Sequence, residues 1–261
     1  MSKAFYEKLL QALQENKRAR SVTILDGDLP AGVSNGHSWL FVDGEVCCGT
    51  IGKETDELFI EKQNEVSRRS PTKVVTCDLG RGPCRLFVEL HEPTPRLLLV
   101  GAGHIAQSMA YIADHLGFQI RVFDDRKDFV VPELFPKGTE LVLGKWPEVG
   151  KKMNPGQTDF VVIVTHAHSG DGEALVSLLD YDVAYLGMIG SKRKVKALLE
   201  RAKEKGCEAQ KLEKVFSPIG LAIAAETPAE IAISILAEIV AVARGSDPGQ
   251  AGSCSITGRK G

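Results

Sequence analysis

Polar side chains that could hold or act on a ligand follow one strongly apolar run. Thr165, His166, His168 and Asp171 come directly after Phe160–Val164. Such a run is typical of a strand covered on both faces, and open α/β sheets bind ligands where these strands end. The side chains could donate to phosphate or pterin oxygens, satisfy only their own loop, or chelate a metal such as zinc. We favour a ligand pocket, then a structural loop, then a metal site.

A second cluster follows the predicted strand Val183–Gly187. Gly190 begins a glycine turn, and Ser191 can cap the helix expected next. Lys192 and Arg193 add positive charge to the first turn of that helix, where cations oppose the helix dipole. A bound anion would relieve this mismatch, whereas a solvated basic turn is the plain alternative.

A glycine-rich turn follows the apolar run Leu97–Val100. The segment 101–106 reads G-A-G-H-I-A, the G-x-G-x-x-A pattern of the first strand–helix unit of a Rossmann fold. Gly101 permits a tight turn, and Gly103 leaves room for a pyrophosphate near the backbone. The helix that starts at His104 offers free N–H groups to phosphate. The turn predicts a nucleotide-type ligand but names no reaction.

An acid stands where this pattern places one. The second strand, Gln119–Phe123, ends in Asp124, 23 positions after Gly101. A Rossmann acid at about this spacing contacts a ribose 2′-hydroxyl. The alternative is an acid that only caps the loop after the strand.

The elements that must position these residues fall into two parts, separated by the proline-containing linker His91–Arg96. Residues 1–92 are expected to form a smaller α+β domain. Its expected elements are the helices Lys3–Lys17 and Thr55–Val66 and the strands Ser21–Leu25, Ser38–Val42, Glu45–Cys48, Lys73–Thr76 and Arg85–Leu90.

Residues 96–244 alternate strands and helices, which predicts an α/β domain with a Rossmann-like parallel sheet. The last helix is marked by a capping box of Thr227 and Glu230. Residues 245–261 are expected to be a flexible tail. The remaining expected elements are the strands Glu140–Leu143 and Val215–Phe216 and the helices Gly172–Leu179, Lys192–Lys205 and Pro228–Arg244.

Composition narrows the classes of protein. The chain has 261 residues, 43% hydrophobic and 25% charged, which is typical of a globular protein. A net charge of −2 gives no electrostatic reason to bind nucleic acid or an anionic membrane. The sequence shows neither a signal peptide nor a membrane-length apolar run, so we expect a cytoplasmic location with reduced thiols. The six cysteines form no C-x-x-C pair, so no structural zinc site is expected.

Six motifs stand in order along the second half of the chain. They are V-G-A-G-H at 100–104, F-D-D-R at 123–126, V-T-H-A-H-S-G-D at 164–171, Y-L-G-M-I-G-S-K-R-K at 185–194, S-P-I-G-L at 217–221 and E-T-P-A-E-I-A-I-S-I-L-A-E-I at 226–239. Together they resemble the xanthine dehydrogenase accessory family, also called XdhC/CoxI.

The resemblance implies a role as a chaperone rather than as a turnover enzyme. Members bind the molybdenum cofactor, as molybdopterin or its cytosine dinucleotide. They help it acquire a sulfido ligand from a cysteine desulfurase, and they deliver it to a molybdenum hydroxylase such as the large subunit of xanthine dehydrogenase. By this resemblance, the loops Gly101–His104, Thr165–Asp171 and Gly190–Arg193 would hold the cofactor's phosphate or dinucleotide.

The N-terminal half departs from the family pattern. The family's G-S-x-P-R-x-x-G and G-G-C-V-E motifs correspond to segments 25–32 and 48–54, which lack the arginine and place the cysteine before the glycines. Cys84 aligns best, with the family's later P-C-G-G. The resemblance therefore makes Cys84 a candidate thiol toward molybdenum or sulfur, with Cys47 and Cys48 as positional candidates. The plain alternative is that each is a small buried residue.

Two other functions stay open at this level. The chain could be an NAD(P)-dependent oxidoreductase, with His166 or His168 as its general acid or base, or a nucleotide-binding sensor without chemistry. The apolar face of the last helix, which includes Ile235 and Ile239, could be core or the seam of a homodimer.

Overall fold

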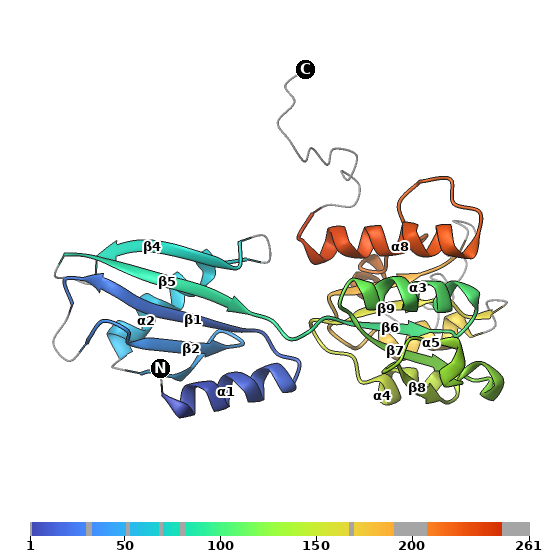
Figure 1. The fold of residues 1–261 in the computed structure, drawn as a ribbon, viewed down its shortest axis with the longest axis horizontal. Helices are drawn as coiled ribbons and strands as arrows, with labels where there is room; N and C mark the ends of the chain where they lie inside the picture. Colours follow the sequence, from blue (N-terminus) through green and yellow to red (C-terminus); the bar gives the residue numbers. More distant parts are fainter. Residues whose placement is uncertain are drawn as a thin grey trace, which may run out of the picture. The chain divides into compact units, whose positions relative to one another are not determined.

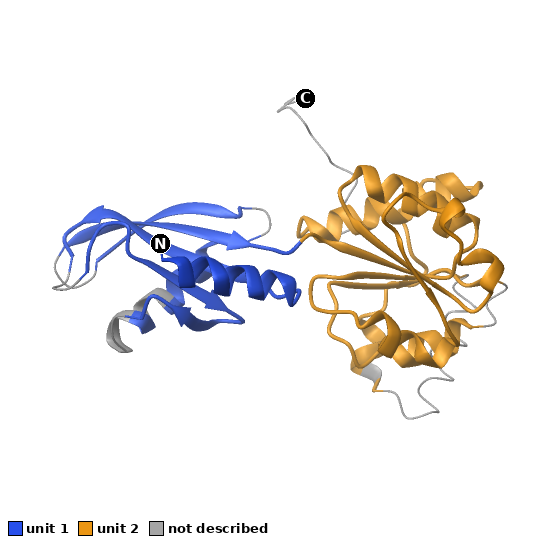
Figure 2. Cartoon of the chain, turned by 60° about the horizontal axis from the view of Figure 1, so that its bottom comes forward, with its two compact units in different colours: residues 1–93 blue, residues 94–261 orange. Residues whose placement is uncertain are grey.

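The computed structural model describes residues 2–29, 33–50, 53–67, 70–78, 82–166, 170–190 and 208–246. The chain divides into two compact units, Met1–Pro93 and Thr94–Gly261 (Figure 2). No helix among the described residues has the length and apolar character needed to cross a membrane.

The first unit is an antiparallel sheet between two helices, with strand order β3-β2-β1-β5-β4. Its elements are α1 (Lys3–Gln14), β1 (Ala19–Gly27), β2 (Ser38–Val42), β3 (Glu45–Cys48), α2 (Lys53–Lys62), the 3-10 turn η1 (Gln63–Glu65), β4 (Thr72–Asp78) and β5 (Pro83–His91).

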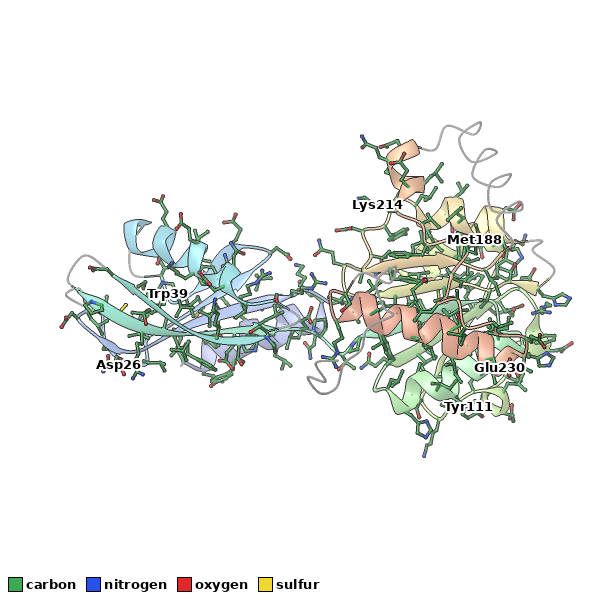
Figure 3. The ribbon with its side chains drawn as sticks, turned by 90° about the horizontal axis from the view of Figure 1, so that it is seen from above. Asp26, Trp39, Tyr111, Met188, Lys214 and Glu230 are labelled. Carbon is green, nitrogen blue, oxygen red and sulfur yellow. The ribbon has the colours of Figure 1, made fainter. Side chains whose placement is uncertain are left out.

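Successive residues of β2 serve the two faces of this sheet, as the period of a strand requires. Leu40 packs with Phe5 of α1 on one face. Trp39 points to the other face, where its indole N–H donates to Asp56 of α2 at 2.8 Å (Figure 3). The helices therefore cover opposite faces of the sheet.

Both helices of this unit end earlier than the sequence predicted. Asn16 adopts a left-handed conformation with φ of +59°, so α1 stops at Gln14 rather than at Lys17. After α2, the chain tightens into η1, whose buried Gln63 donates to the Gly44 carbonyl at 3.2 Å. Val66, the predicted last residue of that helix, is extended.

The second unit is a five-stranded parallel sheet with helices on both faces (Figure 1). Its strands run in the order β10-β9-β6-β7-β8, and every neighbouring pair is parallel. The strands are β6 (Arg96–Val100), β7 (Gln119–Asp124), β8 (Glu140–Leu143), β9 (Phe160–Ile163) and β10 (Tyr185–Met188). The helices and turns are α3 (His104–His115), η2 (Lys127–Phe129), η3 (Pro132–Leu134), η4 (Trp146–Glu148), α4 (Val149–Met153), α5 (Asp171–Leu178), α7 (Ala209–Glu213) and α8 (Pro228–Ala243).

The apolar strands divide their side chains between two cores. Leu97, Leu99 and Val162 pack under α3 and α8. Leu98 and Val161 face the other way, in the core that α4 and α5 cover. The predicted α/β class, with a parallel-sheet domain after a smaller α+β part, is therefore confirmed.

One expected strand is reduced to a single bridge. Instead of a strand at Val215–Phe216, only Phe216 pairs with Gly187 of β10, in parallel. Pro218 follows two residues later, and because proline has no backbone N–H it cannot extend the ladder. The predicted helix Lys192–Lys205 and the tail from residue 247 lie outside the described residues.

Candidate functional site

The order of the parallel strands reverses between β6 and β9. From β6 the chain proceeds to β7 and β8 on one side, and then crosses to β9 and β10 on the other. In sheets of this topology the ligand crevice lies beyond the carboxyl ends of the two strands at the reversal. The glycine turn follows β6 and the threonine–histidine segment follows β9, so the fold brings these two predicted segments to one edge of the sheet (Figure 1).

Gly101 is locked between the neighbouring strands. Its N–H donates to the Phe123 carbonyl at the end of β7, at 2.7 Å. On the other side, a Cβ at this position would lie 2.4 Å from the Val164 carbonyl oxygen. Its φ of +116° is also a conformation that side-chain-bearing residues rarely adopt. Glycine is therefore required here by the packing of the turn against β9.

Gly103 faces open space. No atom lies within 4 Å of the place where its Cβ would be, and its φ of −72° is ordinary. It is the N-cap of α3, and no side chain caps this helix, whereas Thr227 caps α8. The first N–H groups of a helix have no partner within it, so α3 presents donors and its positive dipole end to the crevice. This geometry suits a phosphate group.

Two side chains complete the start of α3. His104, its first residue, is exposed at the edge of the open space around Gly103. Gln107 reaches back and donates to the Ala102 carbonyl at 3.0 Å, which fixes the turn from the helix side.

Asp124 is fully buried and holds the glycine turn in place. Its carboxylate accepts the Ala102 N–H at 2.7 Å, the Arg126 N–H at 3.0 Å and the Arg126 guanidinium at 2.8 and 2.9 Å. Burial alone raises the pKa of Asp124, but these hydrogen bonds outweigh burial and hold the pKa below its usual range. The observed contacts of this carboxylate are with the chain itself, and a contact with ribose stays a prediction.

The segment after β9 is closed by two of the predicted residues. The Thr165 hydroxyl donates to Asp171 Oδ1 at 2.5 Å, and both side chains are buried. Asp171 begins α5, so this bond ties the end of the strand to the start of the helix. His166 lies between them and is exposed at the crevice edge. Thr165 and Asp171 therefore fit the structural interpretation, whereas a ligand contact of His166 stays a prediction.

Part of the predicted site falls outside the described residues. This applies to His168, Ser191, Lys192 and Arg193. Gly190 is described and is half-buried after β10. Among the described residues, no three histidine, cysteine, aspartate or glutamate side chains gather to hold a metal ion.

Two residues that shape this edge were missed at the sequence level. The Trp146 ring packs against Phe123 with ring centroids 5.8 Å apart, and it also touches Gly170, where a Cβ would lie 2.4 Å from the indole. It therefore wedges the start of α5 against β7. The Arg126 guanidinium lies 3.8 Å over the Phe129 ring while it binds Asp124. The sequence offered only a weak signal for Trp146, namely that tryptophan is rare in this chain, which has two.

The S-P-I-G-L segment is anchored to α8 and β10. Buried Glu238 accepts the Gly220 N–H at 3.1 Å and the Tyr185 hydroxyl. Burial, followed by the bond to Glu238, raises the pKa of Tyr185 well above its usual range. At its other end the Ser217 hydroxyl donates to the Met188 carbonyl at 2.8 Å. Figure 3 labels Met188 at the end of β10. The segment therefore serves as a clamp within the unit.

The candidate thiols lie in the first unit and are not gathered together. Cys84 on β5 is buried, and burial, followed by its neighbour Cys77, raises the pKa of Cys84 to about 12. A thiol with this pKa is protonated at neutral pH and is a poor ligand or nucleophile. Cys47 and Cys48 are half-buried on the edge strand β3. Because β2 and β1 separate β3 from β5, the two places lie about 14 Å apart.

A cavity of about 730 Å³ lies elsewhere in the second unit. It is lined by residues that precede or begin β10, such as Asp182 and Tyr185, and by Lys211 and Lys214 from α7 and the residue after it. This is the amino edge of the sheet, opposite the glycine turn. Since α/β sheets of this topology bind ligands at the carboxyl edge, we keep the candidate site at the turn.

Comparisons with known proteins identify the family to which this chain belongs and several of its relatives. A family model described as the XdhC Rossmann domain matches residues 97–239, a range that includes the glycine turn, Asp124 and the segment after β9. An uncharacterized protein, YqeB, of Escherichia coli K12 is 38% identical over 175 residues, which cover 67% of this chain and 32% of the relative. A protein of Bacillus subtilis described as a probable subunit of xanthine dehydrogenase is 32% identical over 155 residues, covering 59% of this chain and 45% of the relative.

The aligned part of this chain thus spans about a third and somewhat under half of the lengths of these two relatives. Among solved structures, a xanthine dehydrogenase from Bacillus halodurans superposes with a TM-score of 0.54. It covers 96% of this chain and 98% of its own at 20% identity, a level that shows a shared fold.

Proposed function

This chain belongs to the family of the XdhC Rossmann domain, and from that premise we propose that it is an accessory protein of a xanthine dehydrogenase system that binds the molybdenum cofactor. The relative from Bacillus subtilis, which is described as a probable subunit of xanthine dehydrogenase, supports the link to that system. The cofactor would be molybdopterin or its cytosine dinucleotide, delivered to the large subunit of a molybdenum hydroxylase.

The observation that carries the proposal is the start of α3. An uncapped helix begins at Gly103, where a side chain is absent and the space is open. Molybdopterin carries a terminal phosphate and its cytosine dinucleotide a bridging pyrophosphate, and the oxygens of both groups accept N–H groups of this kind. His104 and His166 stand at the rim and would donate to further ligand oxygens.

The turn is preorganised for this task. Asp124 holds the Ala102 N–H, and Gln107 holds the Ala102 carbonyl, so the backbone between Gly101 and Gly103 is fixed before a ligand arrives. Preorganisation reduces the ordering cost of binding. It also suits a carrier, since the donors need no catalytic group beside them.

The thiols fit the proposal less well than the turn does. Cys84 aligns with the family's cysteine, yet its burial and its raised pKa keep it protonated at neutral pH. We therefore assign the binding role of this chain to the phosphate end of the cofactor. In this proposal the sulfur atom for the sulfido ligand comes from a partner cysteine desulfurase, and Cys84 takes no direct part.

The same turn would also accept the pyrophosphate of NAD(P), which keeps the oxidoreductase and sensor functions as alternatives. Titration calorimetry with NADH and NADPH separates them from the cofactor carrier. Micromolar binding of either dinucleotide, together with oxidation of that dinucleotide by a carbonyl substrate, would favour the oxidoreductase. Binding without turnover would favour the sensor.

A transfer assay tests the proposal directly. Cofactor-loaded chain is mixed with a molybdenum hydroxylase that was produced without its cofactor, and the recovered hydroxylase activity is followed over time. We expect faster recovery than with the same amount of free cofactor, and slower recovery with a Gly103→Ala chain. Recovery no faster than with free cofactor would argue against a delivery role.

A further inference from the structure

Two cysteines face each other across neighbouring strands of the first unit. Cys77 of β4 and Cys84 of β5 are directly opposite in the antiparallel register. Their Sγ atoms lie 3.4 Å apart, and both side chains belong to the same apolar cluster on one face of the sheet. Neither residue lies in the part of the chain that the family model matches, which begins at residue 97.

The register of the two strands places the Cα atoms of this pair within the range that disulfides span. The Leu90 N–H donates to the opposite Pro71 carbonyl at 2.7 Å, which makes that pair a hydrogen-bonded one. Hydrogen-bonded pairs recur at every second residue of a regular antiparallel ladder, and the register from Thr72 to Asp78 is unbroken. Cys77 and Cys84 are therefore such a pair, with Cα atoms about 5.5 Å apart, which is the usual separation in disulfides.

The two thiols differ in access. Gly27 of β1 lies opposite Cys84, and a Cβ at Gly27 would come within 2.4 Å of the Cys84 Cα. Strand β1 therefore covers Cys84, which is only 1% exposed. Cys77 lies on β4, the outer strand of the sheet, and is half-buried. A reagent from solution would meet Cys77 first.

We propose that Cys77 and Cys84 form a redox-active dithiol, which a low-molecular-weight disulfide converts to an intramolecular disulfide and which thiol reductants restore. In the first step the Cys77 thiolate attacks one sulfur of the oxidant and releases one thiolate, leaving a mixed disulfide on Cys77. In the second step Cys84 loses its proton and attacks the Cys77 sulfur, which releases the second thiolate. Two protein thiols become one disulfide, and one oxidant molecule becomes two thiols.

The environment of the two cysteines controls the rate of this thiol–disulfide exchange. Burial raises the pKa of Cys84, so the thiolate needed for the second step is scarce at neutral pH. The thiolate fraction rises about tenfold for each pH unit below that pKa, so the linked form should appear faster at pH 8.5 than at pH 7. Closure requires no change of register, because the two cysteines are already directly opposite and their Sγ atoms lie 3.4 Å apart.

The sequence allows an unambiguous test on the full chain. Trypsin cleaves after Arg81, between the two cysteines, so a disulfide would join peptide 74–81 to peptide 82–85. The reduced chain is incubated with oxidised glutathione at pH 8.5, alkylated, and digested without reductant for mass spectrometry. We expect the linked peptide pair in most of the chain, and its loss after treatment with dithiothreitol.

Two variants serve as controls. Cys77→Ser changes a half-buried residue on an outer strand, so it should keep the far-ultraviolet circular dichroism of the parent and lose the linked pair. The double change Cys47→Ser and Cys48→Ser should leave the linked pair unchanged. Cys77 recovered only as a glutathione mixed disulfide, or both thiols recovered alkylated, would overturn the proposal, as would a link from Cys77 to another cysteine. None of these outcomes depends on whether the chain binds a cofactor.

Discussion

Alanine is expected to destabilise the fold at one glycine of the turn after β6 and to weaken ligand binding at the other. At Gly101 it should destabilise the fold, because its Cβ would stand 2.4 Å from the Val164 carbonyl oxygen and ordinary contacts begin at 3.4 Å. The end of β9 would have to retreat by about 1 Å, in a core packed at crystal density. The φ of +116° adds backbone strain of about 1–3 kcal/mol.

We expect Gly101→Ala to lose about 3 kcal/mol of unfolding free energy, which lowers Tm by about 6–12 °C for a chain of this size. Gly103→Ala differs, because its Cβ meets nothing within 4 Å and its φ of −72° is ordinary. Alanine is a poorer N-cap than glycine by under ~1 kcal/mol, but it reduces the entropy of the unfolded chain by a similar amount. The two effects nearly cancel, so Tm should stay within about 2 °C.

Ligand binding should respond in the reverse order. A methyl group at Gly103 would occupy the open space in front of the α3 N–H groups and displace a phosphate oxygen from them. A hydrogen bond to a charged group contributes about 1.5–3 kcal/mol, so Gly103→Ala should weaken binding by about 10- to 100-fold. Thermal unfolding by circular dichroism and cofactor retention during purification measure the two effects. Full retention in Gly103→Ala, or parental stability in Gly101→Ala, would refute the assignment of these roles.

Three further changes test the contacts around the sheet. Asp124→Asn removes the carboxylate that binds the Arg126 guanidinium and should cost about 2 kcal/mol at pH 7 in urea unfolding. Because the folded-state pKa of Asp124 is lowered, this contribution is present above the unfolded value of about 3.9 and is lost as pH falls through the folded-state pKa. The gap between parent and variant should therefore shrink in acid, and a gap that stays constant with pH would contradict the assignment. Tyr185→Phe removes a hydrogen bond to buried Glu238 and should lower the free energy of unfolding by about 1–3 kcal/mol, which appears as a lower midpoint in urea unfolding. An unchanged midpoint would count against the clamp. Thr227→Ala removes the α8 capping box and should lower Tm by about 2–4 °C in calorimetry, and no change would exclude a role for the cap.

The glycine turn could be predicted because its signals are local. The pattern from Gly101 to Ala106 follows an apolar strand and opens a helix, and the alternation after the linker predicts the parallel sheet that the structure has. The family resemblance, carried by the same motifs, is confirmed by the match over residues 97–239.

Side-chain roles depended on contacts that the sequence does not contain. Asp124 stands at the spacing expected of a ribose acid, yet its rotamer turns it onto Ala102 and Arg126. Thr165 and Asp171 were predicted as ligand-binding residues, and in the structure the Thr165 hydroxyl donates to Asp171. Neither outcome follows from residue type, because each is decided by which neighbour is within reach.

The environment of the cysteines also depends on contacts that the sequence does not contain. Cys84 was singled out by alignment, but its environment is set by β1 and β4, which pair with β5 on either side. Cys77 carried no signal of its own, since its role depends on the register between two strands. A register is a long-range property, and shifting it by one residue would send the Cys77 side chain to the other face of the sheet.

The most direct measurement is the ligand content of the chain purified anaerobically from a host grown with molybdate. The protein is denatured, the released material is oxidised to its fluorescent pterin form, and molybdenum is determined in parallel. We expect stoichiometric pterin and molybdenum in the parent chain and a marked loss of both in Gly103→Ala. A bound nicotinamide dinucleotide with no pterin would contradict the proposed carrier function and favour the oxidoreductase or the sensor.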